Sequence, residues 1–297
     1  MFNTILGLLK TAYELGAIYA VMALGVFISY RTLDTPDLTV DSSFTLGAAC
    51  SAVFALAGHP VIGLLVGFLA GGAAGAITAL LNTKLKIAAL LSGILMMLGL
   101  YSINLRIMGQ PNISLARAAN IFSIADKIPN GKIILSTGLL IIVVVALWLF
   151  LNTKLGLALR ATGDNEHMVR ASGVDTDTMK LIGMAVANAL VALSGSVMAQ
   201  QQKFTDLNMG VGMVVIGLAS VIIGEVIFGT RPILRRLIAV ALGSVVYRAV
   251  IGAAMQLGLP ASDMKLITAV IVIVALALPN LFSGAGSLKK LSKGPVK

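Results

Sequence analysis

The chain has 297 residues, of which 58% are hydrophobic and 11% are charged, and its formal net charge is +10. This apolar content exceeds what a soluble core requires and indicates a protein that crosses a membrane several times. The positive charge would suggest nucleic-acid binding in a soluble protein, but basic cytoplasmic loops explain it in a membrane protein, so we expect no nucleic-acid partner.

About nine apolar segments follow one another along the chain, and a membrane-spanning helix needs roughly 20 such residues. The segments are rich in Leu, Ala, Ile and Gly and lack the alternating pattern of a β-barrel. We therefore predict an all-α polytopic membrane protein in which residues 1–297 form one transmembrane domain. The predicted segments are 5–30, 42–58, 61–81, 87–108, 133–151, 180–202, 212–228, 237–257 and 264–280.

Basic residues are concentrated in four places between or after these segments. Placing all four in the cytoplasm agrees with the positive-inside rule and with one crossing by each of the last six segments. The C-terminus is then cytoplasmic, and the N-terminus lies outside if segment 42–58 crosses completely. The four places are Lys84 with Lys86, residues 154–180, residues 231–236, and a basic tail, 283–297.

A polar stretch at 31–43 interrupts the apolar sequence and contains three Asp residues and a proline. Pro36 lacks a backbone donor and disfavours helix at Thr35, so we expect a new helix further on, capped by residues 41–43. The break is either an ordinary surface loop or, as we favour, a broken helix that faces a translocation path. A fainter break at 203–212 would be its counterpart, and paired breaks indicate the substrate pathway of a transporter.

Two further features each allow two interpretations. Glycines at 63, 67, 71 and 75 recur every four residues, a spacing that lets helix backbones approach closely; we favour packing within one subunit over a dimer seam. The longest external connection on this topology, 109–132, is either a plain loop or a docking site for an extracellular binding protein.

The residue patterns of common catalytic chemistry are absent from the sequence. No phosphate-binding Gly-x-x-x-x-Gly-Lys-Ser/Thr loop occurs, so we expect this chain not to hydrolyse ATP itself. We expect no catalytic residue, no metal site and no cofactor, because His59 and His167 lie far apart and no nucleophile–base set is visible. Glu225 is embedded in an apolar run; it is either a functional intramembrane acid or, as we favour, the partner of Arg231 or Arg235.

Residues 152–180 form a polar segment with four basic and four acidic side chains. A first amphipathic helix is expected up to Gly163, and Asp164 and Asn165 are expected to cap a second helix, 165–172, that ends at Gly173. Glu166 precedes Arg170 by four residues, the favourable order for an ion pair. A solvated loop would explain the charges, but the caps favour an ordered cytoplasmic segment that contacts a soluble partner.

This segment resembles the cytoplasmic coupling segment of ABC importer permeases of the branched-chain amino acid/ribose type. The family pattern is Gly-x-x-x-Arg-Ala, a short polar helix and then Gly-Val/Ile, and it falls here on Gly156, Arg160, Ala161 and Gly173. The stretch Thr-Pro-Asp-Leu-Thr-Val-Asp-Ser-Ser at 35–43 resembles the family's broken early helix. It departs from the family at Asp41, where Gly is usual.

The resemblance implies a permease subunit in a prokaryotic plasma (inner) membrane, paired with a second permease copy as a homodimer. Separate ATPase subunits would bind ATP and Mg, and an extracellular or periplasmic binding protein would deliver the solute. The version at 35–43 is similar to the subgroup that carries amino acids, including aromatic ones. A sugar or nucleoside permease is the alternative, followed by an ion-coupled secondary transporter.

The resemblance also assigns roles to particular residues. The expected contacts with the ATPase are Gly156, Arg160, Asp164, Asn165, Glu166, Arg170 and Gly173. The expected substrate pathway is formed by Asp37, Thr39, Asp41, Ser42 and Ser43.

Overall fold

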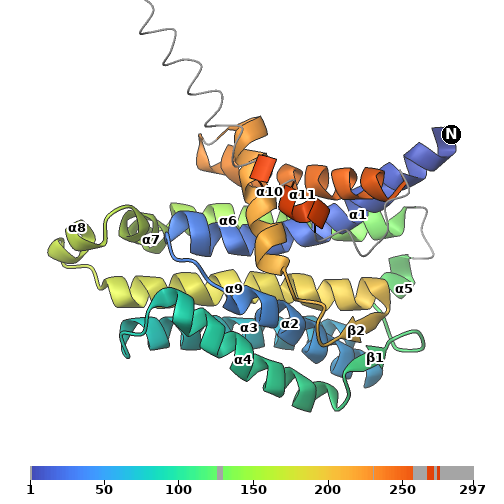
Figure 1. Ribbon diagram of the computed structural model, residues 1–297, viewed down its shortest axis with the longest axis horizontal. Helices are drawn as coiled ribbons and strands as arrows, with labels where there is room; N and C mark the ends of the chain where they lie inside the picture. The colour runs from blue at the N-terminus through green and yellow to red at the C-terminus, as the bar shows by residue number, and fades with distance from the viewer. Residues whose placement is uncertain (1, 126–129, 230, 257–265, 271–272, 275–297) are drawn as a thin grey trace, which may run out of the picture.

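Long apolar helices lie side by side in the computed structural model, which describes residues 2–125, 130–229, 231–256, 266–270 and 273–274 (Figure 1). The described helices are α1 (Phe2–Val26), α2 (Thr39–Leu56), α3 (Pro60–Thr83), α4 (Ala89–Met108), α5 (Phe122–Ala125), α6 (Gly131–Asn152), α7 (Lys154–Asp164), α8 (Glu166–Ala171), α9 (Thr176–Gln202), α10 (Met213–Phe228) and α11 (Ile233–Gln256). A π-helical turn, η1 (Phe27–Thr32), extends α1, and the strands β1 (Asn112–Ser114) and β2 (Phe204–Asp206) pair antiparallel.

Seven helices of the described chain are long and apolar enough to cross a membrane. They are α1 with η1, α2, α3, α4, α6, α9 and α11, and α10 is a shorter apolar helix. The predicted all-α polytopic fold is therefore confirmed, and each predicted segment up to 237–257 coincides with one of these helices. Segment 264–280 lies largely outside the described residues, so the number of spans stays a prediction.

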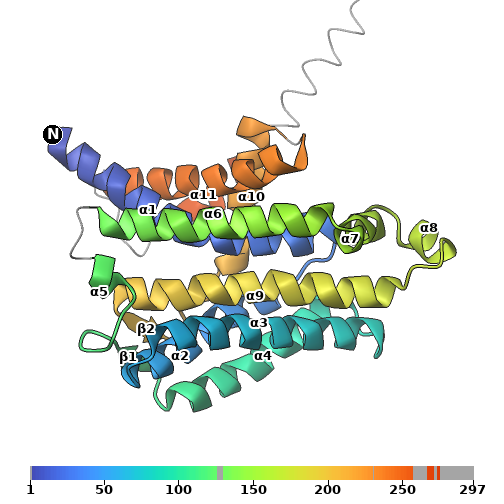
Figure 2. The ribbon, with the colours of Figure 1, turned by 180° about the vertical axis from the view of Figure 1, so that it is seen from behind.

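Helix α9 forms the centre of the bundle. It runs between a layer that contains α1 and α6 and a second layer formed by α2, α3 and α4 (Figure 2). Small residues along it, such as Ala187, Ala192 and Ala199, are fully buried, which allows the neighbouring backbones to approach closely. The segments that precede and follow α9 are therefore held against a common scaffold.

The glycine row of α3 packs inside the chain, as we favoured. A Cβ atom on Gly67 would meet the Ser196 hydroxyl of α9, and one on Gly75 would meet the backbone oxygen of Met184. Gly63, at the other end of the row, lies against Ser51 of α2. The spacing of four residues thus places one side of α3 against α2 and α9.

Neighbouring glycines of α3 provide a matched pair of variants. A Cβ on Gly71 would lie 2.5 Å from the Asn188 backbone oxygen, whereas a Cβ on Gly72 would meet its nearest atom, in Ala189, at 3.5 Å. We expect Gly71→Ala to destabilise the protein by about 1–3 kcal/mol, the usual cost of overpacking. Gly72→Ala should leave the melting temperature of the detergent-purified protein unchanged or slightly raised. Equal melting temperatures for the two variants would contradict this packing.

Candidate functional site

The polar segment after α6 folds as two short capped helices. The Thr153 hydroxyl accepts a hydrogen bond from the Gly156 N–H at 3.2 Å, which caps α7, and the Asn165 side chain accepts one from the Met168 N–H at 3.0 Å, which caps α8. Gly173 follows α8 with φ of +83°, a conformation that favours glycine. The predicted helix pair and its Asn165 cap are thus observed, with α7 extending to Asp164.

Helix α7 is fixed to the bundle through close backbone contacts. A Cβ on Gly156 would lie 2.5 Å from the Leu151 Cα, and one on Gly163 would meet the backbone oxygen of Thr32 at the end of η1. Leu159 is fully buried, and its side chain packs beside Gly183 of α9. A displacement of α7 therefore acts directly on η1 and on the start of α9.

Charged side chains attach α8 to the beginning of α9. Glu166 accepts from Lys180 at 2.7 Å and from Arg170 at 3.1 Å, so the predicted i,i+4 pair forms. Arg170 also contacts Asp177 at 3.3 Å. The hydrogen bond from Lys180, aided by the charges of Lys180 and Arg170, lowers the pKa of Glu166. This stabilisation is therefore present at neutral pH and is lost as acidification protonates Glu166.

The outer surface of the helix pair carries an apolar residue that the sequence analysis did not select. Asp164, Asn165 and His167 are exposed there, and the Met168 side chain is 60% exposed. Figure 1 shows α7 and α8 projecting beyond the end of the bundle. The sequence signal that could have identified Met168 was an unbranched apolar side chain inside a short charged helix. Exposed Met residues are enriched at protein interfaces.

The two predicted breaks in the helical sequence meet each other. Asp41 accepts hydrogen bonds from the Gly212 N–H and the Val214 N–H, both at 2.9 Å. Gly212 is the N-cap residue of α10 and Val214 lies in its first turn, so a carboxylate from the first break caps the helix that follows the second. Gly210 lies directly against the Asp41 backbone, where a Cβ would not fit.

The expectation that residues 41–43 cap their own helix is wrong. Helix α2 already begins at Thr39, and the Asp37 carboxylate accepts the Thr39 N–H at 2.8 Å. An Asp side chain readily makes this bond to a backbone two residues on. Asp41 is consequently inside α2 with its side chain free to cap α10.

The predicted pathway residues lie in a seam packed by the chain's own helices. Asp37 accepts from the Asn188 amide of α9 at 2.7 Å, and Thr39 shares a 2.9 Å hydrogen bond with Thr78 of α3. Ser42 donates to the Met97 backbone oxygen of α4 at 2.9 Å, and Ser43 is fully buried. Asp37 precedes α2 and the other four predicted residues lie in its first two turns. Contact of these five residues with a solute stays a prediction.

Glu225 forms ion pairs, but with partners other than those predicted. Its oxygens lie 2.6 Å from Arg236 Nε of α11 and 3.2 Å from Arg31 Nε of η1. Arg235, one of the predicted partners, instead donates to the Phe228 backbone oxygen at 2.8 Å. The favoured ion-pair interpretation is thus observed, with Arg236 next to the predicted Arg235 and with Arg31, which helix packing brings to this position.

The Glu225 ion pairs carry a stability prediction. We expect Glu225→Gln to destabilise the protein by about 2 kcal/mol; this is below the ~3–5 kcal/mol of a fully buried pair because Arg31 is half exposed. Energised transport should nevertheless persist in the variant, because both arginines and the fold remain. A variant that retains wild-type stability but loses transport would identify Glu225 as a functional acid instead.

The long connection 109–132 is ordered against the second break. Ile113 pairs with Thr205 in the two-stranded sheet, and the Asn120 amide donates to the Gln200 backbone oxygen at 2.6 Å. Residues 126–129 lie outside the described chain. Docking of a binding protein on this connection stays a prediction.

Three of the four basic clusters lie at the α8 end of the bundle. Lys84 lies close to Asp175 at the start of α9. A hydrogen bond from Thr178 lowers the pKa of Asp175, and the charge of Lys84 lowers it further. Arg236 lines a cavity together with Arg160 of α7. The tail 283–297 lies outside the described residues.

Within the described chain, no group of three or more His, Cys, Asp or Glu side chains is arranged to hold a metal ion.

The described chain is thus a bundle of helices that are long and apolar enough to cross a membrane, with a capped helix pair at one end. Residues 9–277 match the family model of the branched-chain amino acid transport system / permease component, and the chain belongs to this family. It is a multi-pass membrane permease of the ABC type.

Named relatives extend over most of the chain. A tyrosine transport system permease protein of Clostridioides difficile is 43% identical over 268 residues, which cover 89% of this chain and 88% of the relative. An uncharacterized protein of Rickettsia prowazekii is 34% identical, with 92% and 98% covered. The ribose import permease of Escherichia coli is 24% identical, with 89% and 83% covered.

A solved structure shares the fold. The complex of PsaBC from Streptococcus pneumoniae with a Fab contains a chain that matches with a TM-score of 0.51 at 14% identity, over 93% of this chain and 95% of that one. At this identity the likeness concerns the arrangement of helices alone.

Proposed function

We propose that this chain is the membrane subunit of an ATP-driven importer that carries an amino acid into a prokaryotic cell. In this proposal the α8 end of the bundle is cytoplasmic and contacts a separate ATPase subunit that binds ATP and Mg. A substrate-binding protein delivers the solute at the opposite end, and a second copy of the chain completes the pathway.

The observation that carries the proposal is the capped helix pair α7–α8. Its exposed tip, with Met168 at the surface, is attached to α9 by the bonds of Glu166 to Lys180 and Arg170. A rigid, projecting element can transmit a displacement, whereas a solvated loop would absorb it. A partner that pushes on this tip would therefore move the bundle.

The contacts of α7 suggest how such a displacement reaches the broken helices. Gly163 lies against Thr32, and Leu33 packs with Leu159 beside Gly183. The chain then continues through residues 34–38 to α2, where Asp41 holds the start of α10. Rotation of α7 would thus shift η1, the first break and α10 together, which supports their role in alternating access.

Amino acids are the solute class that the relatives support best. The 43% identical relative is named for tyrosine transport, and the family description names branched-chain amino acids. The ribose permease is the more distant relative, at 24% identity. A hydrophobic amino acid is therefore the first solute to test, with ribose as the comparison.

Uptake into proteoliposomes tests this function. The permease would be reconstituted with its co-purified ATPase and binding protein, with ATP inside or outside the vesicles. We expect uptake of L-tyrosine or L-leucine that requires ATP on the ATPase side and persists with a protonophore. Ribose uptake without amino-acid uptake would overturn the solute class. Uptake that is driven by a proton gradient without ATP would support a secondary transporter instead.

A further inference from the structure

Arg248 is a positively charged residue inside a membrane-spanning helix. It lies on α11 about 18 Å from Arg236, at 1.5 Å per residue. Helix α11 is long and apolar enough to cross the roughly 30 Å apolar core of a bilayer, so Arg248 lies within a membrane-crossing segment, in the half remote from α7 and α8. Charged residues at such depth are costly, and they normally mark a functional position with a defined partner.

Arg248 has no anionic partner in the described chain. Its guanidinium lies over the Tyr19 ring at 3.7 Å, and its Nε atom is buried without a hydrogen-bond partner. Glu14, a carboxylate on the facing helix α1, accepts from Gln201 instead. Arg31 and Arg236, in contrast to Arg248, both contact a carboxylate, that of Glu225. The Nε donor of Arg248 is thus unused, and the guanidinium lies over an aromatic ring.

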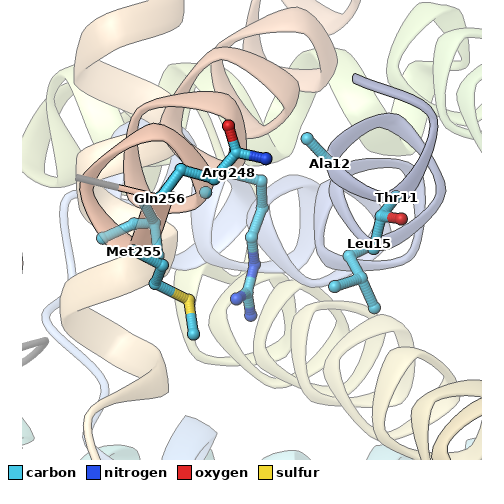
Figure 3. A pocket seen from close by; sticks show the side chains of 8 residues that line it. Thr11, Ala12, Leu15, Arg248, Met255 and Gln256 are labelled. Atoms are coloured by element: carbon cyan, nitrogen blue, oxygen red, sulfur yellow. The ribbon is translucent and has the colours of Figure 1, made fainter. Parts of the chain in front are cut away.

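A cavity of about 280 Å³ adjoins the guanidinium, between α1 and α11. Figure 3 shows the guanidinium between Leu15 of α1 and Met255 of α11, with Gln256 and Thr11 further along the wall. This volume lies just below the range of about 300–1,000 Å³ that is typical of ligand pockets, so the cavity suits one small solute rather than a whole lipid. The cavity lining is largely apolar and contains one cationic group, the Arg248 guanidinium.

We propose that Arg248 binds the carboxylate of the transported amino acid on the outer part of its pathway, while the apolar wall of the cavity holds its side chain. The choice of an amino acid rests on the proposed function. A guanidinium matches a carboxylate because two parallel N–H groups can donate to its two oxygens. Tyr19 covers one face of the guanidinium and Nε is buried, so the two terminal NH2 groups are the donors that a carboxylate would use.

Tyr19 also connects this site to the broken helix. Its ring stacks on Phe44 of α2 with centroids 6.1 Å apart and an interplanar angle of 6°. Phe44 is fully buried and lies one helical turn from Asp41. A solute on Arg248 therefore acts, through Tyr19, on the helix that caps α10.

Binding to the purified permease tests the site independently of transport. The wild type, Arg248→Gln and the control Arg106→Gln would be placed in nanodiscs of phosphatidylcholine, and binding of radiolabelled L-tyrosine, L-leucine and tyramine would be measured. Arg106 is an exposed arginine in the last turn of α4. We expect at least tenfold weaker binding of both amino acids by Arg248→Gln alone, and weak binding of tyramine, which lacks the carboxylate, by all three proteins.

A second variant covers the case in which Arg248→Gln misfolds. Met255→Trp fills the cavity without changing the arginine, and Met255 is 52% exposed, so the fold should tolerate the change. It should also weaken amino-acid binding at least tenfold. Unchanged binding in a well-folded Arg248→Gln or Met255→Trp, or no binding of either amino acid to the wild type, would overturn the proposal.

A lipid phosphate is the other source of an oxyanion. Native mass spectrometry would compare phosphatidylglycerol retained by the wild type and by Arg248→Gln. Lipid retention that depends on Arg248, with amino-acid binding unaffected by the substitution, would overturn the proposal. ATP-dependent amino-acid uptake that is equal in the wild type and Arg248→Gln would do the same while leaving the importer function intact. Absence of ATP-dependent amino-acid uptake in the wild type would instead count against the proposed function.

Discussion

Asp41→Ala should destabilise the permease and disconnect its two broken segments. The substitution removes the cap of α10, because the partly buried Gly212 and Val214 N–H groups lose their acceptor, at a cost of about 1–3 kcal/mol. We expect a loss of about 2 kcal/mol in the free energy of unfolding, together with loss of energised transport. Asp41→Asn keeps one acceptor oxygen and should lose about half as much.

A helix cap at the protein surface provides the matched control. Asp175 accepts the Asp177 N–H at 3.0 Å at the start of α9, where it is open to water. Asp175→Ala should produce a smaller shift in melting temperature, because water can replace the lost acceptor. Equal shifts for Asp41→Ala and Asp175→Ala would mean that the bond between the two breaks is not a structural requirement.

Met168→Asp should abolish coupling to the ATPase without unfolding the permease. Burying a Met side chain in a partner contributes about 1.5–3 kcal/mol, and a carboxylate left unpaired in the same contact adds a further penalty. Affinity for the ATPase should therefore fall by about 100-fold or more. Leu85→Asp is the control: Leu85 is 65% exposed and follows α3 at the same end of the bundle, outside α7 and α8.

Variants of the charged residues that hold α8 against α9 distinguish a loss of tip structure from a loss of contact with the ATPase. Glu166→Gln removes the anion that holds Lys180 and Arg170, so it should loosen α8 against α9 and weaken coupling in proportion to that loosening. Arg160 and Asp164 line a cavity with Arg236, and their expected contact with the ATPase can be tested by the same affinity measurement. Wild-type affinity in Met168→Asp would remove the tip from the interface.

The sequence was sufficient for features that depend on local order. Hydropathy located the spans because each needs a run of apolar residues, and Asn165 revealed the cap of α8 because a cap and its helix are adjacent in the chain. Gly173 ended the pair for the same reason. These features can be read from a few consecutive residues.

Features that depend on packing between distant segments could not be predicted in this way. Asp41 caps α10 from far along the chain, and Glu225 pairs with Arg31 because η1 and α10 meet. Arg248 was overlooked in its apolar run, although a charge at that depth was a usable signal. Its lack of a carboxylate partner became apparent only when the facing helix was in place.

Affinity purification tests most directly whether the tip of α7–α8 binds an ATPase subunit. The tagged permease would be purified in mild detergent as wild type, Met168→Asp and Leu85→Asp, and the associated proteins would be identified by mass spectrometry. We predict an ATP-binding subunit with the wild type and Leu85→Asp and its absence from Met168→Asp. Recovery of the wild-type chain without an ATPase, or equal recovery of the ATPase with all three proteins, would contradict the account.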